Sequence, residues 1–317
     1  MTFRAAVVQM SAVPFDKAKS TDKVVSRIEE AAAQGANLIV FPEATLSGYP
    51  KGLDFGARVG GRQPRGKEEY LRYYNGAIDV PGPETDRIGA AAKEANAYVV
   101  IGVMEREQGT IYCTALHFGP DGALLGKHRK LVPTAMERII WGQGDGSTMP
   151  VYDTSLGAKL GTVICWENYM PLFRTYMYAK GVQLYCAPTA DDRDVWLPSM
   201  QHIAIEGRCF VFSACQYATR GDYPEDYDAI QGDSADAVIF RGGSVIVSPT
   251  GEVLAGPNHD SECVLYAEID VDDTIRGKFD LDVVGHYSRP DVFRLLVDEE
   301  PKTNVISTEA VLGEFTA

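Results

Sequence analysis

Short apolar runs alternate with helical stretches along the chain, from the first residues to about position 270. The runs at 4–9 and 38–41 are short, rich in Val, Ile and Ala, and typical of buried strands. Between them, apolar residues recur at helical spacing over 17–34, and Gly35 follows as a stop signal. This alternation predicts an α/β fold in which the strands are buried between helices.

The same two patterns continue through the rest of the chain. Further strands are predicted at 98–104, 113–118, 123–127, 159–164, 183–186, 210–214, 243–247 and 263–269. Further helices are predicted at 84–95, 171–180 and 195–207. The sequence Gly-Pro-Asp-Gly at 119–122 is a turn signal, so the strands on either side of it are expected to form a hairpin.

Two segments interrupt the alternation. The stretch 49–79 is rich in Gly, Arg and Tyr and is predicted to be a lid or an interface insertion, whereas 220–236 reads as an acidic loop. From about residue 297 the chain is polar and charged with little periodicity. Since no linker divides the remainder, we predict one domain over 1–296 and a polar tail over 297–317.

The composition narrows the classes of protein that fit. With 45% apolar and 23% charged residues, the chain has the balance of a soluble globular protein. A net charge of −14 argues against nucleic acid and against an anionic membrane as partners. The N-terminal apolar run is too short for a signal peptide, and no run approaches the ~20 apolar residues of a membrane span. We therefore expect a soluble, cytoplasmic protein.

Cysteine and histidine spacing give no reason to expect a metal site. The six cysteines form no Cys-x-x-Cys pair, and the five histidines show no metal-ligand spacing. Without an export signal the cysteines are expected to be free thiols, most of them small buried apolar side chains. We predict neither a metal nor a cofactor.

Three residues with reactive or ionisable side chains follow apolar runs. They are Glu43, Lys130 and Cys165. Each alone has a structural interpretation: Glu43 as a capping carboxylate, Lys130 as part of a solvated basic cluster, and Cys165 as a buried cysteine. Binding crevices in α/β folds lie at strand ends. Taken together, a carboxylate beside a lysine would accept the proton that a thiol must lose before it attacks. Spacing alone does not prove that the three side chains meet.

The blocks that contain these residues resemble a known family. Phe41-Pro42-Glu43, His128–Thr134 and Ile164–Asn168 are similar to the three signature blocks of the nitrilase superfamily, in its order. The similarity extends from about residue 5 to 293 through 137–146, 185–191 and 285–290. The Cys-Trp-Glu-Asn form of the last signature block resembles true nitrilases more than amidases or carbamoylases.

The resemblance implies a single-domain αββα sandwich and a Glu-Lys-Cys triad. Residue by residue, it makes Glu43 the general base, Lys130 the electrostatic stabiliser and Cys165 the nucleophile. Glu137 matches a second family glutamate, which would orient the lysine or assist proton movement. The implied reaction hydrolyses an aryl, arylaliphatic or aliphatic nitrile to the carboxylic acid and ammonia through a thioimidate and a thioester. The resemblance also implies a homodimer or larger homo-oligomer.

Four residues are candidates for substrate binding. Tyr49 and Trp166 lie close in sequence to proposed catalytic groups, and Pro188 and Thr189 follow a predicted strand end. Two other functions stay open. An amidase or carbamoylase would use the same triad on a C–N single bond, and a non-catalytic filament or binding protein would not use the triad at all.

Overall fold

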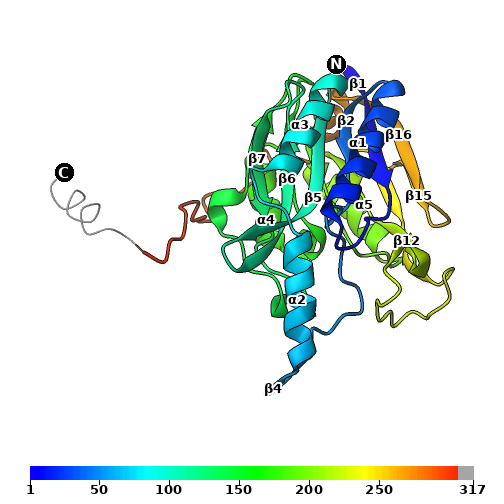
Figure 1. Ribbon diagram of the computed structural model, residues 1–317. Coiled ribbons are helices and arrows are strands. Elements are labelled where there is room, and N and C mark those ends of the chain that lie inside the picture. The colour runs from blue at the N-terminus through cyan, green and yellow to red at the C-terminus, as the bar shows by residue number, and fades with distance from the viewer. Residues whose placement is uncertain (306–317) are drawn as a thin grey trace.

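The computed structural model describes residues 1–305, and its centre is a pair of six-stranded sheets packed face to face (Figure 1). Helices cover the outer face of each sheet, so the predicted αββα sandwich is confirmed. Among residues 1–305, no helix is long and apolar enough to cross a bilayer.

The first sheet has the strand order β16-β1-β2-β5-β6-β7. Its strands are β1 (Thr2–Gln9), β2 (Ala36–Val40), β5 (Tyr98–Glu107), β6 (Thr110–Phe118), β7 (Leu124–Arg129) and β16 (Cys263–Asp270). β1, β2 and β5 are parallel, whereas β5, β6 and β7 form consecutive antiparallel pairs, the second closed by the predicted turn at 119–122. Helices α1 (Lys17–Ala33) and α3 (Pro83–Ala95) pack on its outer face, and the Asp16 side chain caps α1 by accepting from Lys19 N.

The second sheet has the order β15-β14-β11-β10-β9-β8. Its strands are β8 (Val151–Asp153), β9 (Lys159–Thr162), β10 (Leu184–Cys186), β11 (Phe210–Ser213), β14 (Ser244–Val247) and β15 (Val253–Asn258). Helices α4 (Pro171–Ala179) and α5 (Trp196–Gly207) cover its outer face, and α6 (Asp272–Lys278) follows β16. The strands and helices predicted from the sequence therefore all occur, with ends shifted by a few residues.

A continuous apolar core joins the two sheets. Val7, Leu38 and Val100 of the first sheet pack in one cluster with Leu184 and Phe212 of the second. Alternate residues of the same strands point outward into the clusters under the helices. Because both faces of each sheet are buried, the central strands read as continuous apolar runs rather than as polar–apolar alternation.

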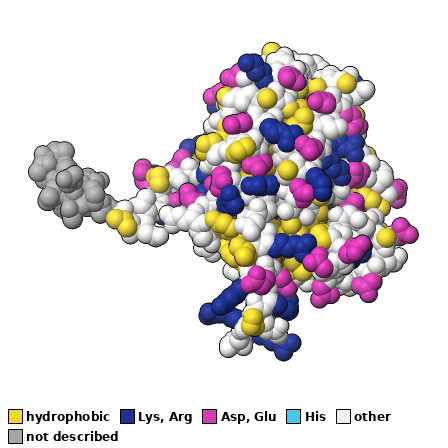
Figure 2. All heavy atoms as spheres, in the orientation of Figure 1, with side chains coloured by type: hydrophobic (Ala, Val, Ile, Leu, Met, Phe, Trp, Pro, Cys, Tyr) yellow, Lys and Arg dark blue, Asp and Glu magenta, His cyan; other side chains and the backbone are white. Residues whose placement is uncertain are grey.

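The segment 49–79, for which a lid or an interface insertion was predicted, contains regular structure that the sequence pattern did not indicate. It contains the short strands β3 (Ala57–Arg58) and β4 (Gly61–Arg62) and the helix α2 (Pro64–Gly76), which projects from the sandwich (Figure 1). Basic side chains gather around the projecting end (Figure 2). Sequence periodicity missed α2 because it buries little apolar surface; Tyr73 is its one fully buried large side chain.

The acidic stretch 220–236 is a loop as predicted, between β12 (Tyr217–Thr219) and β13 (Val238–Arg241), with one short 3₁₀ turn, η4 (Arg220–Asp222). Buried Tyr223 and Tyr227 anchor it. Residues 297–305 of the predicted tail contain no helix or strand, and the rest of that tail lies outside the described residues. The boundary between a domain and a tail at 296 stays a prediction.

Candidate active site

The two sheets deliver the three candidate residues to one place. Glu43 follows β2, and the chain there passes so close to Gly102 of β5 that a Cβ at Gly102 would lie 2.4 Å from the Pro42 oxygen. Lys130 directly follows β7. Cys165 comes from the second sheet, where it begins the 3₁₀ turn η3 (Cys165–Tyr169) after β9. Glycine at 102 is therefore required for the backbone beside the carboxylate to fit.

A buried chain of charges surrounds Lys130. Its Nζ lies 2.8 Å from Glu43 Oε1 and 2.8 Å from Glu137 Oε2. Glu137 belongs to the 3₁₀ turn η1 (Ala135–Ile139), and its carboxylate also accepts from Tyr49 OH at 2.7 Å and Thr134 N at 2.6 Å. Burial alone would lower the Lys130 pKa, but the carboxylates, Glu43 foremost, raise the pKa well above its ordinary value. The ammonium therefore stays charged throughout the physiological range.

The Glu43 carboxylate is fully buried and uses its two oxygens differently. Oε1 accepts hydrogen bonds from Lys130 Nζ at 2.8 Å and from Cys113 Sγ at 3.3 Å. Oε2 has no hydrogen-bond partner among the described residues. Burial raises the Glu43 pKa, and Lys130 opposes that rise. The main-chain oxygen of Glu43 accepts from Gln216 Nε2 at 2.8 Å, which anchors the backbone behind the side chain.

Cys165 is held in a strained backbone conformation. Its φ of +50° lies in the left-handed region, which costs a residue with a Cβ about 1–2 kcal/mol. Cys165 N donates to Pro188 O at 2.8 Å, and Asn168 Nδ2 donates to Cys165 O at 2.7 Å. Thr189 Oγ1 lies 3.2 Å from the sulfur. Burial, with the Glu43 charge, raises the Cys165 pKa, so the resting side chain is a thiol that needs a base to take its proton.

Packing places the thiol beside the buried charges. Cys165 shares a hydrophobic cluster with Cys113 and Trp141. Cys113 contacts Glu43, and the Trp141 ring centre lies 5.4 Å from Lys130 Nζ. The structure therefore brings together all four residues that the sequence singles out for catalysis.

A second buried carboxylate joins the two arms of the site. Glu167 Oε2 accepts from Ile164 N at 2.9 Å and lies 2.9 Å from His128 Nε2, while Oε1 accepts from Leu131 N at 2.6 Å. His128 Nδ1 lies 2.6 Å from Thr148 O, so both ring nitrogens face acceptors. Burial by itself lowers the His128 pKa, but Glu167 outweighs it and raises the pKa. This pair ties the end of β7 to the turn that carries Cys165.

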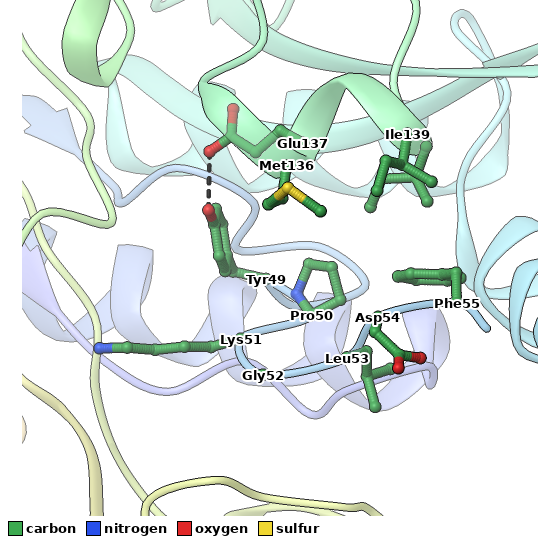
Figure 3. A pocket seen from close by; sticks show the side chains of 11 residues that line it. Tyr49, Pro50, Lys51, Gly52, Leu53, Asp54, Phe55, Met136, Glu137 and Ile139 are labelled. Carbon is green, nitrogen blue, oxygen red and sulfur yellow. Dashed lines mark hydrogen bonds between the residues drawn. The ribbon is translucent and has the colours of Figure 1, made fainter. Parts of the chain in front are cut away.

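A cavity of about 330 Å³ opens beside Glu137, at the end of the row of buried charges (Figure 3). Tyr49 and Glu137 lie at one end, and their hydrogen bond is drawn in the figure. Apolar side chains form much of the remaining wall, among them Leu53, Phe55 and Met136. The cavity suits a small organic molecule with an apolar side arm.

The four predicted substrate-binding residues lie in three different settings. Tyr49 lines the cavity, and its ring contacts Trp141 edge-on with the centres 5.5 Å apart. Pro188 and Thr189 touch Cys165 through the contacts given above. Trp166 lies apart from the cavity lining and is 40% exposed.

The surroundings of Trp166 explain its orientation. Its Nε1 donates to Asp191 Oδ2 at 2.8 Å, and the Arg193 guanidinium lies 4.9 Å from its ring centre. Arg193 also forms an ion pair with Asp191. The indole is therefore held by polar partners on the outer side of η3.

Sequence reasoning did not single out several residues that shape the site. Cys113 lies inside a strand and has the pattern of any buried thiol, and His128 is one of five histidines without metal-ligand spacing. The signal for Glu167 was present, because it lies in the Cys-Trp-Glu-Asn block, but its contacts depend on tertiary structure. Gln216 has no local signal, since it meets Glu43 from a distant part of the chain.

Comparisons with known proteins identify the family of this chain. The model of the carbon-nitrogen hydrolase family matches residues 4–279. A nitrilase of Bradyrhizobium diazoefficiens is 57% identical over 98% of this chain and 96% of its own. An aliphatic nitrilase of Sinorhizobium fredii is 58% identical over 96% and 98%, and a bifunctional nitrilase/nitrile hydratase of Lupinus angustifolius is 53% identical over 98% and 90%.

Solved structures share the fold. A carbon-nitrogen hydrolase superfamily protein from Xanthomonas campestris superposes with a TM-score of 0.71 at 17% identity, over 94% of this chain and 100% of its own. Nit3 of Saccharomyces cerevisiae gives a TM-score of 0.69 at 22% identity, over 90% and 96%. From the family match and the high identity over nearly the whole chain, it follows that this protein belongs to the carbon-nitrogen hydrolase family, in its nitrilase branch.

Proposed function

We propose that the protein hydrolyses an organic nitrile to the carboxylic acid and ammonia, with Cys165 as nucleophile. The relatives that are more than half identical to it bear the names nitrilase and aliphatic nitrilase, which supports this reaction class. The observation that carries the proposal is the buried Lys130 ammonium between Glu43 and Glu137, packed next to a thiol.

The first step transfers one proton and forms one bond. Glu43 takes the Cys165 proton as the sulfur attacks the nitrile carbon, and one π bond of the nitrile breaks. The nitrogen receives that proton, which gives a thioimidate. Lys130 stabilises the charge that develops in the buried site, where an ion acts more strongly than in water.

Two molecules of water complete the reaction. Glu43 activates the first, which adds to the thioimidate carbon to form a tetrahedral species. When the C–N bond breaks, ammonia leaves and a thioester remains on Cys165. The second water attacks the thioester, releases the carboxylic acid and returns the proton to the sulfur.

The tetrahedral species has a second way to collapse. If the C–S bond breaks before the C–N bond, the product is an amide and the free thiol. A relative 53% identical to this chain is named a bifunctional nitrilase/nitrile hydratase, which makes amide formation a side reaction worth measuring.

The cavity bears on the choice of nitrile. The apolar side chains of its wall, among them Leu53, Phe55 and Met136, would hold an aryl, arylaliphatic or aliphatic side arm, while Tyr49 and Glu137 lie at one end of the cavity. The protein is proposed to work as a cytoplasmic homodimer or larger homo-oligomer and to need no cofactor.

An amidase or carbamoylase is the rival function, since the same side chains can attack a C–N single bond. The experiment is ammonia release from matched panels of nitriles and amides, with the products identified by mass spectrometry. We expect acid and ammonia from nitriles, with amides as poor substrates. Rapid hydrolysis of amides with inert nitriles would overturn the proposal, and turnover of neither panel would favour the non-catalytic reading. The Cys165→Ala variant is the control for contaminating activity.

A further inference from the structure

A second thiol lies against the carboxylate that is proposed to act as base. Cys113 is in the middle of β6, is 1% exposed, and its Sγ is 3.3 Å from Glu43 Oε1. The same residue accepts a hydrogen bond from Lys130 N through its main-chain oxygen at 2.8 Å. Cys113 therefore touches both Glu43 and the backbone of Lys130.

The side chain of Cys113 is a hydrogen-bond donor in this position. Burial, reinforced by the Glu43 charge, raises the Cys113 pKa well above its ordinary value, so the sulfur keeps its proton. A thiol is a weak donor, but a bond to an ionised acceptor is stronger than one to a neutral acceptor. Oε1 thus receives two donors, whereas Oε2 has no partner among the described residues.

We propose that Cys113 is a positioning residue: its thiol, together with Lys130, fixes Oε1 of Glu43, so that Oε2 is the atom that takes the proton of Cys165. This inference rests on the proposed function of Glu43 as the base. It assigns different tasks to two cysteines of one cluster. Cys165 reacts, and Cys113 keeps the carboxylate oriented and ionised.

Other ionisable groups that face Glu43 come from four elements. They are Lys130 after β7, Glu137 in η1, Tyr49 in the segment after β2, and Cys165 in η3. Lys130 favours the charged carboxylate, and the Glu137 charge opposes it. Removing the Cys113 thiol leaves all of these in place, so its effect can be separated from theirs.

The test compares Cys113→Ala and Cys113→Ser with the wild type in the intact protein. The readout is kcat/KM for nitrile hydrolysis as a function of pH. Loss of the donor raises the Glu43 pKa, so the acid limb of the Cys113→Ala profile moves to higher pH by roughly half a unit. At a pH below that limb, kcat/KM falls roughly three-fold and the loss is in kcat, with KM unchanged. The serine hydroxyl still donates, so Cys113→Ser lies closer to the wild type.

Cys209→Ala is the matched control. Cys209 is also a fully buried thiol, but it lies in the cluster under α4 and α5. The Cys209→Ala variant loses one buried sulfur atom, as Cys113→Ala does, but this sulfur does not contact Glu43. The acid limb of its pH profile is therefore expected at the wild-type pH. Thermal unfolding of all variants verifies that each is folded at the assay temperature.

An acid limb of Cys113→Ala that coincides with that of the wild type would overturn the inference. An equal shift in the alanine and serine variants would also overturn it, because the effect would then follow from packing. A second readout does not require nitrile turnover: the pH dependence of Cys165 alkylation by iodoacetamide, located by peptide mass spectrometry. If wild-type protein hydrolysed no nitrile, the proposed function would fail while alkylation still judged the role of Cys113.

Discussion

Two buried carboxylates close to Cys165 differ in one respect. Glu43 and Glu167 are both almost fully buried, and each lies beside a basic side chain, Lys130 and His128 respectively. Both oxygens of Glu167 accept hydrogen bonds, whereas Oε2 of Glu43 has no partner among residues 1–305. An unpartnered buried oxygen is costly, and in this position it leaves an acceptor for a proton.

The difference suggests separate tasks for the two regions: proton transfer at Glu43 and anchoring of the backbone at Glu167. The region around Glu43 keeps a lone pair available, and burial raises the pKa of that carboxyl toward the range of a general base. The region around Glu167 uses its hydrogen-bonding capacity to hold the backbones of Ile164 and Leu131, which lie next to Cys165 and Lys130 in the chain. Changes in the first region should therefore remove activity, and changes in the second should remove stability.

The largest effect is expected from Cys165→Ala. Turnover should fall by at least about 10⁴-fold, since the substitution removes the thiol that is proposed to form the covalent intermediate. Unfolding should change little, because alanine tolerates the φ of +50° no worse than cysteine and loses only one sulfur atom. Steady-state kinetics and thermal unfolding measure the two quantities. A variant with near wild-type turnover would remove Cys165 from the mechanism.

Glu43→Gln should lower kcat by about 10³-fold with little change in stability. The glutamine oxygen can keep the bonds from Lys130 and Cys113, and its NH₂ group takes the position of the oxygen that has no partner. Lys130 retains Glu137 as counter-ion. Urea unfolding measures the stability of the variant, and steady-state kinetics measure its kcat. Undiminished turnover would mean that another residue is the base.

Glu167→Gln applies the same chemical change to the other carboxylate and should give the opposite balance. A glutamine NH₂ group must face one of the donors that now bond to Glu167, so we expect unfolding free energy to fall by about 3 kcal/mol. Residual kcat should stay within about ten-fold of the wild type. If urea unfolding showed equal losses for both Glu→Gln variants, the contrast between the two regions would not hold.

The smallest effect concerns pH. Glu167 raises the pKa of His128 above its ordinary 6.5, so the pair stabilises the fold fully below pH 6.5. That contribution is lost as the pH rises through the raised pKa. The difference in unfolding free energy between the wild type and Glu167→Gln should therefore shrink from pH 6 to pH 9. A difference that stays constant over this range would show that His128 does not titrate with the pair.

The sequence predicted what depends on local pattern. The hairpin at 119–122 follows from Gly-Pro-Asp-Gly, and the strands follow from apolar runs whose two faces are both buried. Resemblance located Glu43, Lys130, Glu137 and Cys165, which meet in the structure. Four side chains were recognisable, but their arrangement was not readable from composition or spacing.

The missing part depends on long-range contacts. Helix α2 (Pro64–Gly76) is rich in charged and polar residues, and Tyr73 is its one fully buried large side chain, so it does not stand out as a core helix in the sequence. The positive φ of Cys165 is unusual for a residue with a Cβ and has no local sequence signal. The thiol of Cys113 gains its partner only when β6 lies beside the chain after β2. Each of these features arises from the tertiary structure.

The origin of the site in two sheets has a consequence for folding. Glu43 and Lys130 extend from the first sheet and Cys165 from the second, and the apolar core between the sheets holds them in register. A refolding chain that has formed helices and one sheet still has no complete site. Recovery of turnover should therefore lag behind recovery of the helical circular dichroism signal and follow the step in which the two sheets dock. Enzymatic activity would then report directly on the docking of the two sheets during refolding.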